Sequence, residues 1–237
     1  MVVVGSRHDQ SARELVTRWA SHDAALLTCE DLSTPGWRHR PSDRSMARAV
    51  VAGQVVRESD IRGVLVKRPW IIEQELTHIS RPDREYVAAE MNAFLVAWLT
   101  SLQCRVLNRP SGTSLSGPNW RPAQWAVAAA RTGIRGEPVT WRAPSPRRRT
   151  SHVASEAGAP PIEVTVVGDR SFGAPDARYA TVARRLASVA GVELLGVRFD
   201  ARERAPHFLS ATAMPSLRHA HVADAVCDYL LATPVMQ

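Results

Sequence analysis

Short, continuous runs of hydrophobic residues dominate the first part of the chain. Four of them predict strands, at residues 2–4, 24–28, 46–56 and 63–67. The third alternates around Gly53 and is expected to form a hairpin. Between the first two, Leu15, Val16 and Trp19 recur at helical spacing. Buried strands separated by an amphipathic helix predict the start of an open α/β layer.

Two further helices are expected between residues 83 and 132. Hydrophobic residues recur at helical spacing from residue 83 to 103, which predicts the longest helix. A short strand at residues 106–107 then leads into a polar loop. Residues 122–132 predict another helix, because Pro122 suits a first turn and Gly133 suits a C-terminal stop.

A segment without hydrophobic periodicity divides the chain. Residues 143–160 are rich in Pro, Ser, Ala, Gly and Arg, which is typical of a flexible linker. The C-terminal part then predicts strands at 162–167, 193–199 and 207–212, and helices at 177–190 and 218–231. We therefore expect an α/β domain at 1–142, a linker at 143–160, and a small α+β unit at 161–237.

Composition narrows the class of protein. With 45% hydrophobic residues in 237, the chain can bury a sizeable core. No apolar run approaches the roughly 20 residues that cross a bilayer, and the first residues do not resemble a secretion signal, so a cytoplasmic location is expected. The net charge of +7 comes almost entirely from arginine, with Lys67 as the only lysine. Because these arginines are dispersed, nucleic-acid binding is disfavoured, and the cluster at 147–149 is expected to be a solvated loop.

Several common sites are not expected. The three cysteines are far apart and odd in number, which argues against disulfides and zinc. His219 and His221 lie two positions apart at an expected helix start, so they should point to different sides, and no metal site is predicted. There is no GxSxG, no Walker loop and no GxGxxG.

A polar loop over residues 108–120 is the strongest candidate for ligand binding. Turn chemistry explains its glycines and proline, yet loops on a rigid sheet also collect binding groups, and both interpretations stay open. Arg68 and Arg109 together would suit a carboxylate. The expected ligand-binding residues are Arg68, Trp70, Asn108, Arg109, Ser114, Asn119 and Trp120.

Three passages, in order, resemble one known superfamily. They are residues 86–110, with Glu90 before a helix, a strand and Asn-Arg-Pro; residues 115–133, ending in an alanine-rich stretch and glycine; and residues 162–172, reading IEVTVVGDRSF. Together they resemble the ATP-grasp superfamily, in particular the ribosomal-S6-modification type and the ligases of graspetide peptides. The resemblance implies an N-terminal pre-ATP-grasp-like open sheet layer plus a reduced ATP-grasp-like α+β unit.

Departures from the family pattern put ATP chemistry in doubt. The lid subdomain would need many tens of residues between the second and third passages, and only 135–161 are present, so we expect it to be lacking. With Lys67 as the only lysine, the phosphate-binding lysines are missing. Ser210 stands where the family has a metal-binding glutamate and Thr212 where it has an asparagine. Since hydroxyls are weak ligands for Mg²⁺, neither a metal nor an ATP cofactor is expected.

The leading hypothesis is therefore a truncated, degenerate ATP-grasp pseudoenzyme without ligase activity. It would bind a peptide, a small molecule or a partner enzyme in a natural-product or peptide-modification pathway, with a homodimer as a further expectation. One alternative is an enzyme with ATP-independent chemistry, whose candidate groups are Glu85, Glu90, Arg109, Asp200 and His207. A residual carboxylate–amine ligase acting with a partner is another, and nucleic-acid binding is the weakest.

Overall fold

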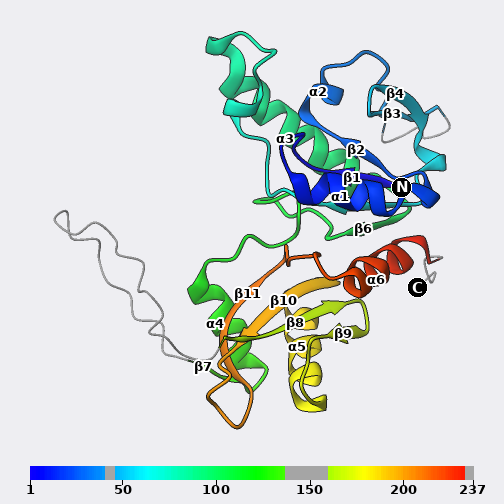
Figure 1. The fold of residues 1–237 in the computed structure, drawn as a ribbon. Helices are drawn as coiled ribbons and strands as arrows, with labels where there is room; N and C mark the ends of the chain where they lie inside the picture. The colour runs from blue at the N-terminus through cyan, green and yellow to red at the C-terminus, as the bar shows by residue number, and fades with distance from the viewer. Residues whose placement is uncertain (41–45, 137–159, 233–237) are drawn as a thin grey trace.

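The computed structural model describes residues 1–40, 46–136 and 160–232. Most of the expected linker and the arginine cluster at 147–149 lie outside these ranges. The described residues form two large sheets, each with helices packed on it, and a separate two-stranded hairpin (Figure 1). None of the described helices combines the length and apolarity required to cross a membrane.

The N-terminal sheet is entirely parallel. Its strands have the order β2-β1-β5-β6, with β1 at Val2–Val4, β2 at Ala25–Leu27, β5 at Gly63–Val66 and β6 at Arg105–Leu107. A hairpin of β3 (Arg48–Val51) and β4 (Gln54–Arg57) and a one-turn helix α2 (Cys29–Leu32) lie beside it. Central parallel strands must be apolar on both faces, and β1 and β5 are buried at every position.

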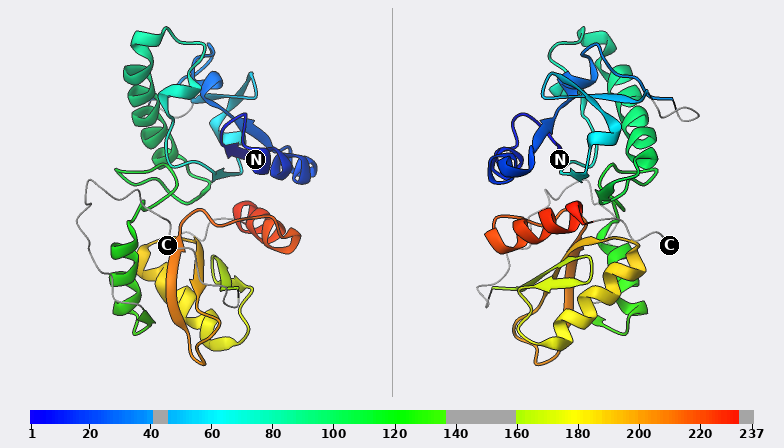
Figure 2. Two further views of the ribbon diagram at one scale, coloured as in Figure 1. Left: turned by 60° about the vertical axis from the view of Figure 1, so that its left-hand side comes forward. Right: turned by 90° about the vertical axis from the view of Figure 1, so that its right-hand side faces the viewer.

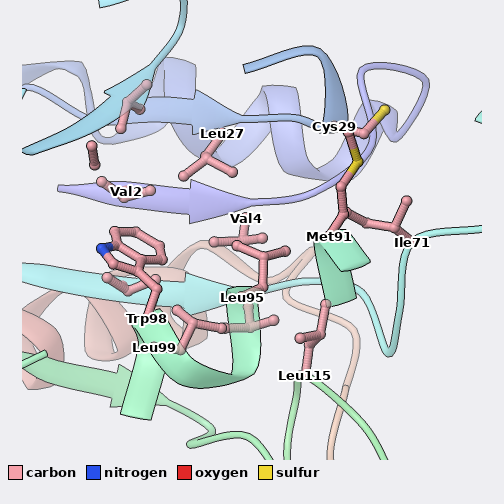
Figure 3. Packing of buried hydrophobic residues seen from close by; sticks show 14 of the residues in the cluster. Val2, Val4, Leu27, Cys29, Ile71, Met91, Leu95, Trp98, Leu99 and Leu115 are labelled. Carbon is pink, nitrogen blue, oxygen red and sulfur yellow. The ribbon is translucent and has the colours of Figure 1, made fainter. Parts of the chain in front are cut away.

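Two helices cover opposite faces of this sheet. Helix α3 (Arg84–Ser101) contributes Leu95, Trp98 and Leu99 to one face, where they meet β1 and β2 (Figure 3). Helix α1 (Gln10–Arg18) packs Leu15 against the other face. The Asp9 carboxylate accepts a hydrogen bond from the backbone N–H of Ala12 and caps the start of α1.

The second sheet is antiparallel except at one edge. Its order is β7-β11-β10-β8-β9, and only the β7–β11 pair is parallel. The strands are β7 (Arg135–Gly136), β8 (Ile162–Val167), β9 (Arg170–Phe172), β10 (Leu194–Phe199) and β11 (His207–Thr212). Helices α4 (Pro122–Arg131) and α5 (Ala177–Ala190) cover one face, and Trp125, Leu186 and Phe199 lie in their common core.

Helix α6 (Ala220–Leu231) connects the two sheets. It lies between them in every view (Figure 2) and contacts β5, β6 and β8. A Cβ at Gly63 would stand 2.8 Å from the Leu230 carbonyl oxygen, so only glycine lets the helix approach β5 this closely. Leu230 and Val226 are fully buried in this contact.

The expected fold class is confirmed, and the long helices and strands occur close to their predicted positions. The sequence patterns did not indicate α2, which is a single turn. Helix α4 and strand β7 precede residue 142, yet they pack with the second sheet. The division at 142 and the lack of a lid both remain predictions, because residues 137–159 lie outside the described ranges.

Candidate ligand-binding site

Asn108 fastens the two sheets together. Its side-chain amide donates to the carbonyl oxygens of Leu194 at 2.8 Å and Ala213 at 3.0 Å. Its oxygen accepts from the backbone N–H groups of Glu193 at 3.1 Å and Leu194 at 2.9 Å. An amide has two donors and two acceptor lone pairs, so internal partners satisfy this buried side chain. The Asn108 side chain therefore holds the two sheets together, and in this structure it has no free group for a ligand.

Arg109 closes the end of α3. Its guanidinium donates to the carbonyl oxygens of Leu99 and Thr100 at 3.3 and 3.4 Å, and to those of Leu102 and Cys104 at 3.3 and 3.4 Å. The last carbonyls of a helix have no partner within the helix and carry partial negative charge. A cation with several donors is therefore well suited to this position.

Arg68 is likewise engaged by the protein. Its buried guanidinium forms an ion pair with Glu75 at 2.9 Å and donates to the Trp70 carbonyl at 3.0 Å. In the described ranges Arg68 and Arg109 have separate partners, so both guanidiniums of the arginine pair expected to bind a carboxylate are already engaged by the protein. Trp70 leaves 43% of its surface exposed.

The remaining predicted residues lie around a separate, small hollow. Ser114, Asn119 and Trp120 line about 90 Å³ between their loop and the end of β11. The Trp120 ring rests against Trp125 of α4, with ring centroids 4.8 Å apart. Arg68 and Trp70 line a second hollow, and Pro69 lies in the lining of both. The seven predicted residues thus divide between two hollows and two structural contacts.

A larger hollow lies on the face of the second sheet that is opposite α4 and α5. It measures about 800 Å³ and reaches from β8 and β10 to the start of α6. Its lining is Glu163, Val164, Thr165, Phe172, Gly173, Gly196, Val197, Arg198, Thr212, Pro215, Ser216, Arg218, His219, His221 and Val222. In the sequence, only Ser210 and Thr212, which stand where the family resemblance implies metal ligands, indicate that this face could be functional.

Strand register explains which side chains reach this face. Val197 and Phe199 lie in the core beneath α5, and side chains alternate along a strand. Gly196 and Arg198 therefore face the hollow, opposite Thr212 and Ser210 respectively in the β10–β11 pairing. The hydroxyl of Thr212 accepts a hydrogen bond from the Met214 N–H at 3.2 Å.

The charges around the hollow are mainly positive. Arg198 and Arg218 face it, and Glu163 is the one acidic residue among its described lining residues. Glu163 is paired with Arg198 at 3.3 Å. Such a wall favours anionic ligands over cations.

The expectation that His219 and His221 point apart is wrong. Their rings stack with centroids 5.8 Å apart and planes 29° from parallel. His219 is the N-cap of α6 and has extended backbone, so helical geometry does not apply to it. No group of three His, Cys, Asp or Glu residues that could hold a metal is found in the described ranges.

The groups considered for ATP-independent chemistry are scattered. Glu85 and Glu90 are exposed on α3, and His207 begins β11. The Asp200 carboxylate accepts a hydrogen bond from the Arg202 guanidinium at 2.6 Å. This hydrogen-bonded ion pair lowers the pKa of Asp200 to about 2. A carboxylate of such low basicity is a poor general base at neutral pH.

Comparisons with known proteins identify the fold. No family model and no curated protein matches the sequence. The macrocyclase MdnC from Microcystis aeruginosa, solved with precursor peptide MdnA, is 11% identical, with a TM-score of 0.65 over 98% of this chain and 99% of that one. A RiPP-associated ATP-grasp ligase from Chryseobacterium gregarium, solved with ADP and a leader and core peptide, is 9% identical, with a TM-score of 0.63 over 97% and 95%.

A RimK-domain ATP-grasp protein from Sphaerobacter thermophilus is also similar. It is 12% identical, with a TM-score of 0.54 over 98% of this chain and 99% of that one. The chain therefore has the ATP-grasp fold, which confirms the resemblance in its sequence passages. At such low identity the likeness establishes the fold, and function must be argued from the chain's own residues.

Proposed function

We propose that this chain is an ATP-grasp-fold protein that binds a peptide in a peptide-modification pathway and does not itself perform ATP-dependent ligation. The observation that carries the proposal is the hollow on the second sheet, which places Arg198 directly opposite Ser210. The family pattern has a carboxylate at the position of Ser210, so here a neutral hydroxyl replaces the expected Mg²⁺ ligand, and the neighbouring strand places a cation beside it.

Phosphoryl transfer argues against ATP use at this face. It requires metal ions and cationic groups around the phosphates as negative charge develops. Ser210 and Thr212 offer neutral hydroxyls, which bind Mg²⁺ far more weakly than carboxylates do. Lys67, the only lysine, follows β5 in the other sheet and cannot replace the missing phosphate ligands.

The same hollow supports peptide binding. Its volume of about 800 Å³ is within the range of sites that hold sizeable ligands. Arg198 and Arg218 favour acidic side chains, the stacked histidine rings offer hydrogen-bonding nitrogens, and Phe172 and Val222 add apolar surface. Structures with this fold include complexes with precursor peptides. We therefore propose an acidic peptide as the ligand.

Fluorescence anisotropy with a fluorescein-labelled hexaglutamate peptide tests the binding. The wild-type protein should bind it saturably at low salt, and the double variant Arg198→Gln/Arg218→Gln should bind about tenfold more weakly, because two solvent-exposed charge contacts of about 0.7 kcal/mol each are lost. Arg131→Gln/Arg185→Gln, which removes two exposed arginines from α4 and α5, is the matched control. Equal affinities of the two double variants would refute the site.

The absence of ligase activity is tested separately. The protein is incubated with Mg–ATP and the same peptide, and ADP release is followed with a coupled assay. The proposal predicts no release above the protein-free background. Peptide-dependent ADP release would show that the chain uses ATP and would overturn this part of the proposal.

A further inference from the structure

The N-terminal sheet contains a topological switch point. Strand β1 leads into α1 on one face, whereas the neighbouring β5 leads into α3 on the opposite face. The two connections therefore diverge beyond the carboxyl ends of β1 and β5. In open α/β sheets such a crevice is where ligands bind.

A hollow occupies this position. It measures about 270 Å³ and is lined by Ser6, Asp9, Lys67, Arg68, Pro69, Trp70, Ile72 and Glu75. The first two follow β1, and the others follow β5. Lys67 is held at the edge because its N–H donates to the Val4 carbonyl at 2.8 Å.

The charged side chains in this hollow differ in whether the protein already supplies them with a partner. The Arg68 guanidinium is paired with Glu75 and with backbone carbonyls. Asp9 caps α1. Within the described residues, the Lys67 ammonium has no hydrogen bond or ion pair, and burial lowers its pKa although the nearby Asp9 charge opposes this shift. Lys67 is thus the cation available to a ligand.

The walls indicate what accompanies the anion. Trp70 and Ile72 line this hollow and are 43% and 40% exposed, so they can offer apolar surface to a ligand. Asp9 and Glu75 would repel a dianionic phosphate more strongly than a monovalent carboxylate.

We infer that the crevice between β1 and β5 is a second binding site, which takes a carboxylate on Lys67 with an attached apolar group against Trp70 and Ile72. A peptide C-terminus or an acidic side chain beside an apolar one would supply this chemistry. The site lies in the other sheet from the hollow beside α6, so it goes beyond the proposed function and does not depend on it.

Ligand-observed NMR with N-acetyl-leucine tests the inference on the full chain. The wild-type protein should bind this probe saturably in the millimolar range, and N-acetyl-leucinamide, which lacks the carboxylate, should bind at least about tenfold more weakly. Lys67→Gln should lose affinity for N-acetyl-leucine by about tenfold, whereas Lys67→Arg should retain most of it. Arg131→Gln, with the same loss of charge far from the crevice, should bind as the wild type does.

The single lysine supplies an independent readout. Reductive methylation with ¹³C-formaldehyde labels Lys67 as the only side-chain amine, and its methyl resonance should move as N-acetyl-leucine is added. Equal binding by Lys67→Gln and Arg131→Gln, equal binding of acid and amide, or displacement of the probe by an equal concentration of inorganic phosphate would each overturn the inference. The carboxylate could come from a peptide C-terminus or from an acidic side chain. To distinguish these two sources, leucyl dipeptides with a free or amidated C-terminus are compared with acetyl-glutamyl-leucinamide.

Discussion

Asn108 and Arg109 stabilise the fold through hydrogen bonds to backbone groups. Asn108 and Arg109 stood out because polar side chains occur there between two apolar elements. The sequence does not reveal their partners, because Asn108 bonds to backbone groups more than 80 positions away. Arg109 bonds to the carbonyls that end α3. Backbone groups as partners leave no residue-type signal along the chain.

Replacing Asn108 should destabilise the protein. In Asn108→Ala, the buried carbonyl and N–H groups of residues 193–194 and 213 lose their partners, so we expect the free energy of unfolding to fall by roughly 2–4 kcal/mol. Urea denaturation measures this change. Asn119→Ala, at an exposed position of the same loop, should change it by less than about 0.5 kcal/mol. Similar losses in both variants would show that Asn108 does not fasten the sheets.

Cys29 predicts a dependence of stability on alkaline pH. Burial raises the pKa of its thiol to about 12, whereas the pKa of a cysteine in the unfolded chain is about 8.5. Above that pH the unfolded state binds fewer protons than the folded state, so the free energy of unfolding falls as pH rises towards 12.

Urea denaturation at about pH 7.5 and 9.5 measures this effect. The wild type should lose about 1 kcal/mol more between these two pH values than Cys29→Ala does. Other groups with raised pKa values, such as Tyr229, remain in both proteins, so the comparison isolates Cys29. An identical fall in the variant would contradict the buried, neutral thiol.

At the scale of elements, hydrophobic periodicity was sufficient for the helices and the longer strands. Helix α5 and strand β11 coincide with their predicted ranges, because each has a clear apolar period and a clear end. Helix α2 and strand β9 are too short to show a period. The packing of α4 on the second sheet depends on three-dimensional pairing, since its apolar face would suit either sheet.

The end of α3 offers a test at this scale. Arg109→Ala removes the donors that satisfy the last carbonyls of the helix. We expect a loss of about 1 kcal/mol in the free energy of unfolding and no change in hexaglutamate binding. Arg131→Ala, which removes an exposed arginine from α4, serves as the control. Weaker peptide binding without a loss of stability would return Arg109 to the role of ligand-binding residue.

For the whole molecule, the ordered passages of the sequence predicted the ATP-grasp fold, and the similar structures confirm it. The hollow beside α6 could not be predicted in the same way. It depends on the β10–β11 register, which turns Arg198 and Thr212 to one face, and on α6 lying between the sheets (Figure 1). The histidine pair was mispredicted because the helix was expected from residue 218, whereas α6 begins at Ala220 and His219 is its extended N-cap.

We propose that this chain, which has the ATP-grasp fold, does not use ATP. Isothermal titration calorimetry of the full chain with Mg–ATP measures this most directly, with binding at micromolar concentrations as the criterion. We predict no saturable heat, because Ser210 and Thr212 stand where the family resemblance implies metal ligands, and the only lysine lies at the other sheet. Saturable binding of Mg–ATP with a micromolar Kd would contradict the account.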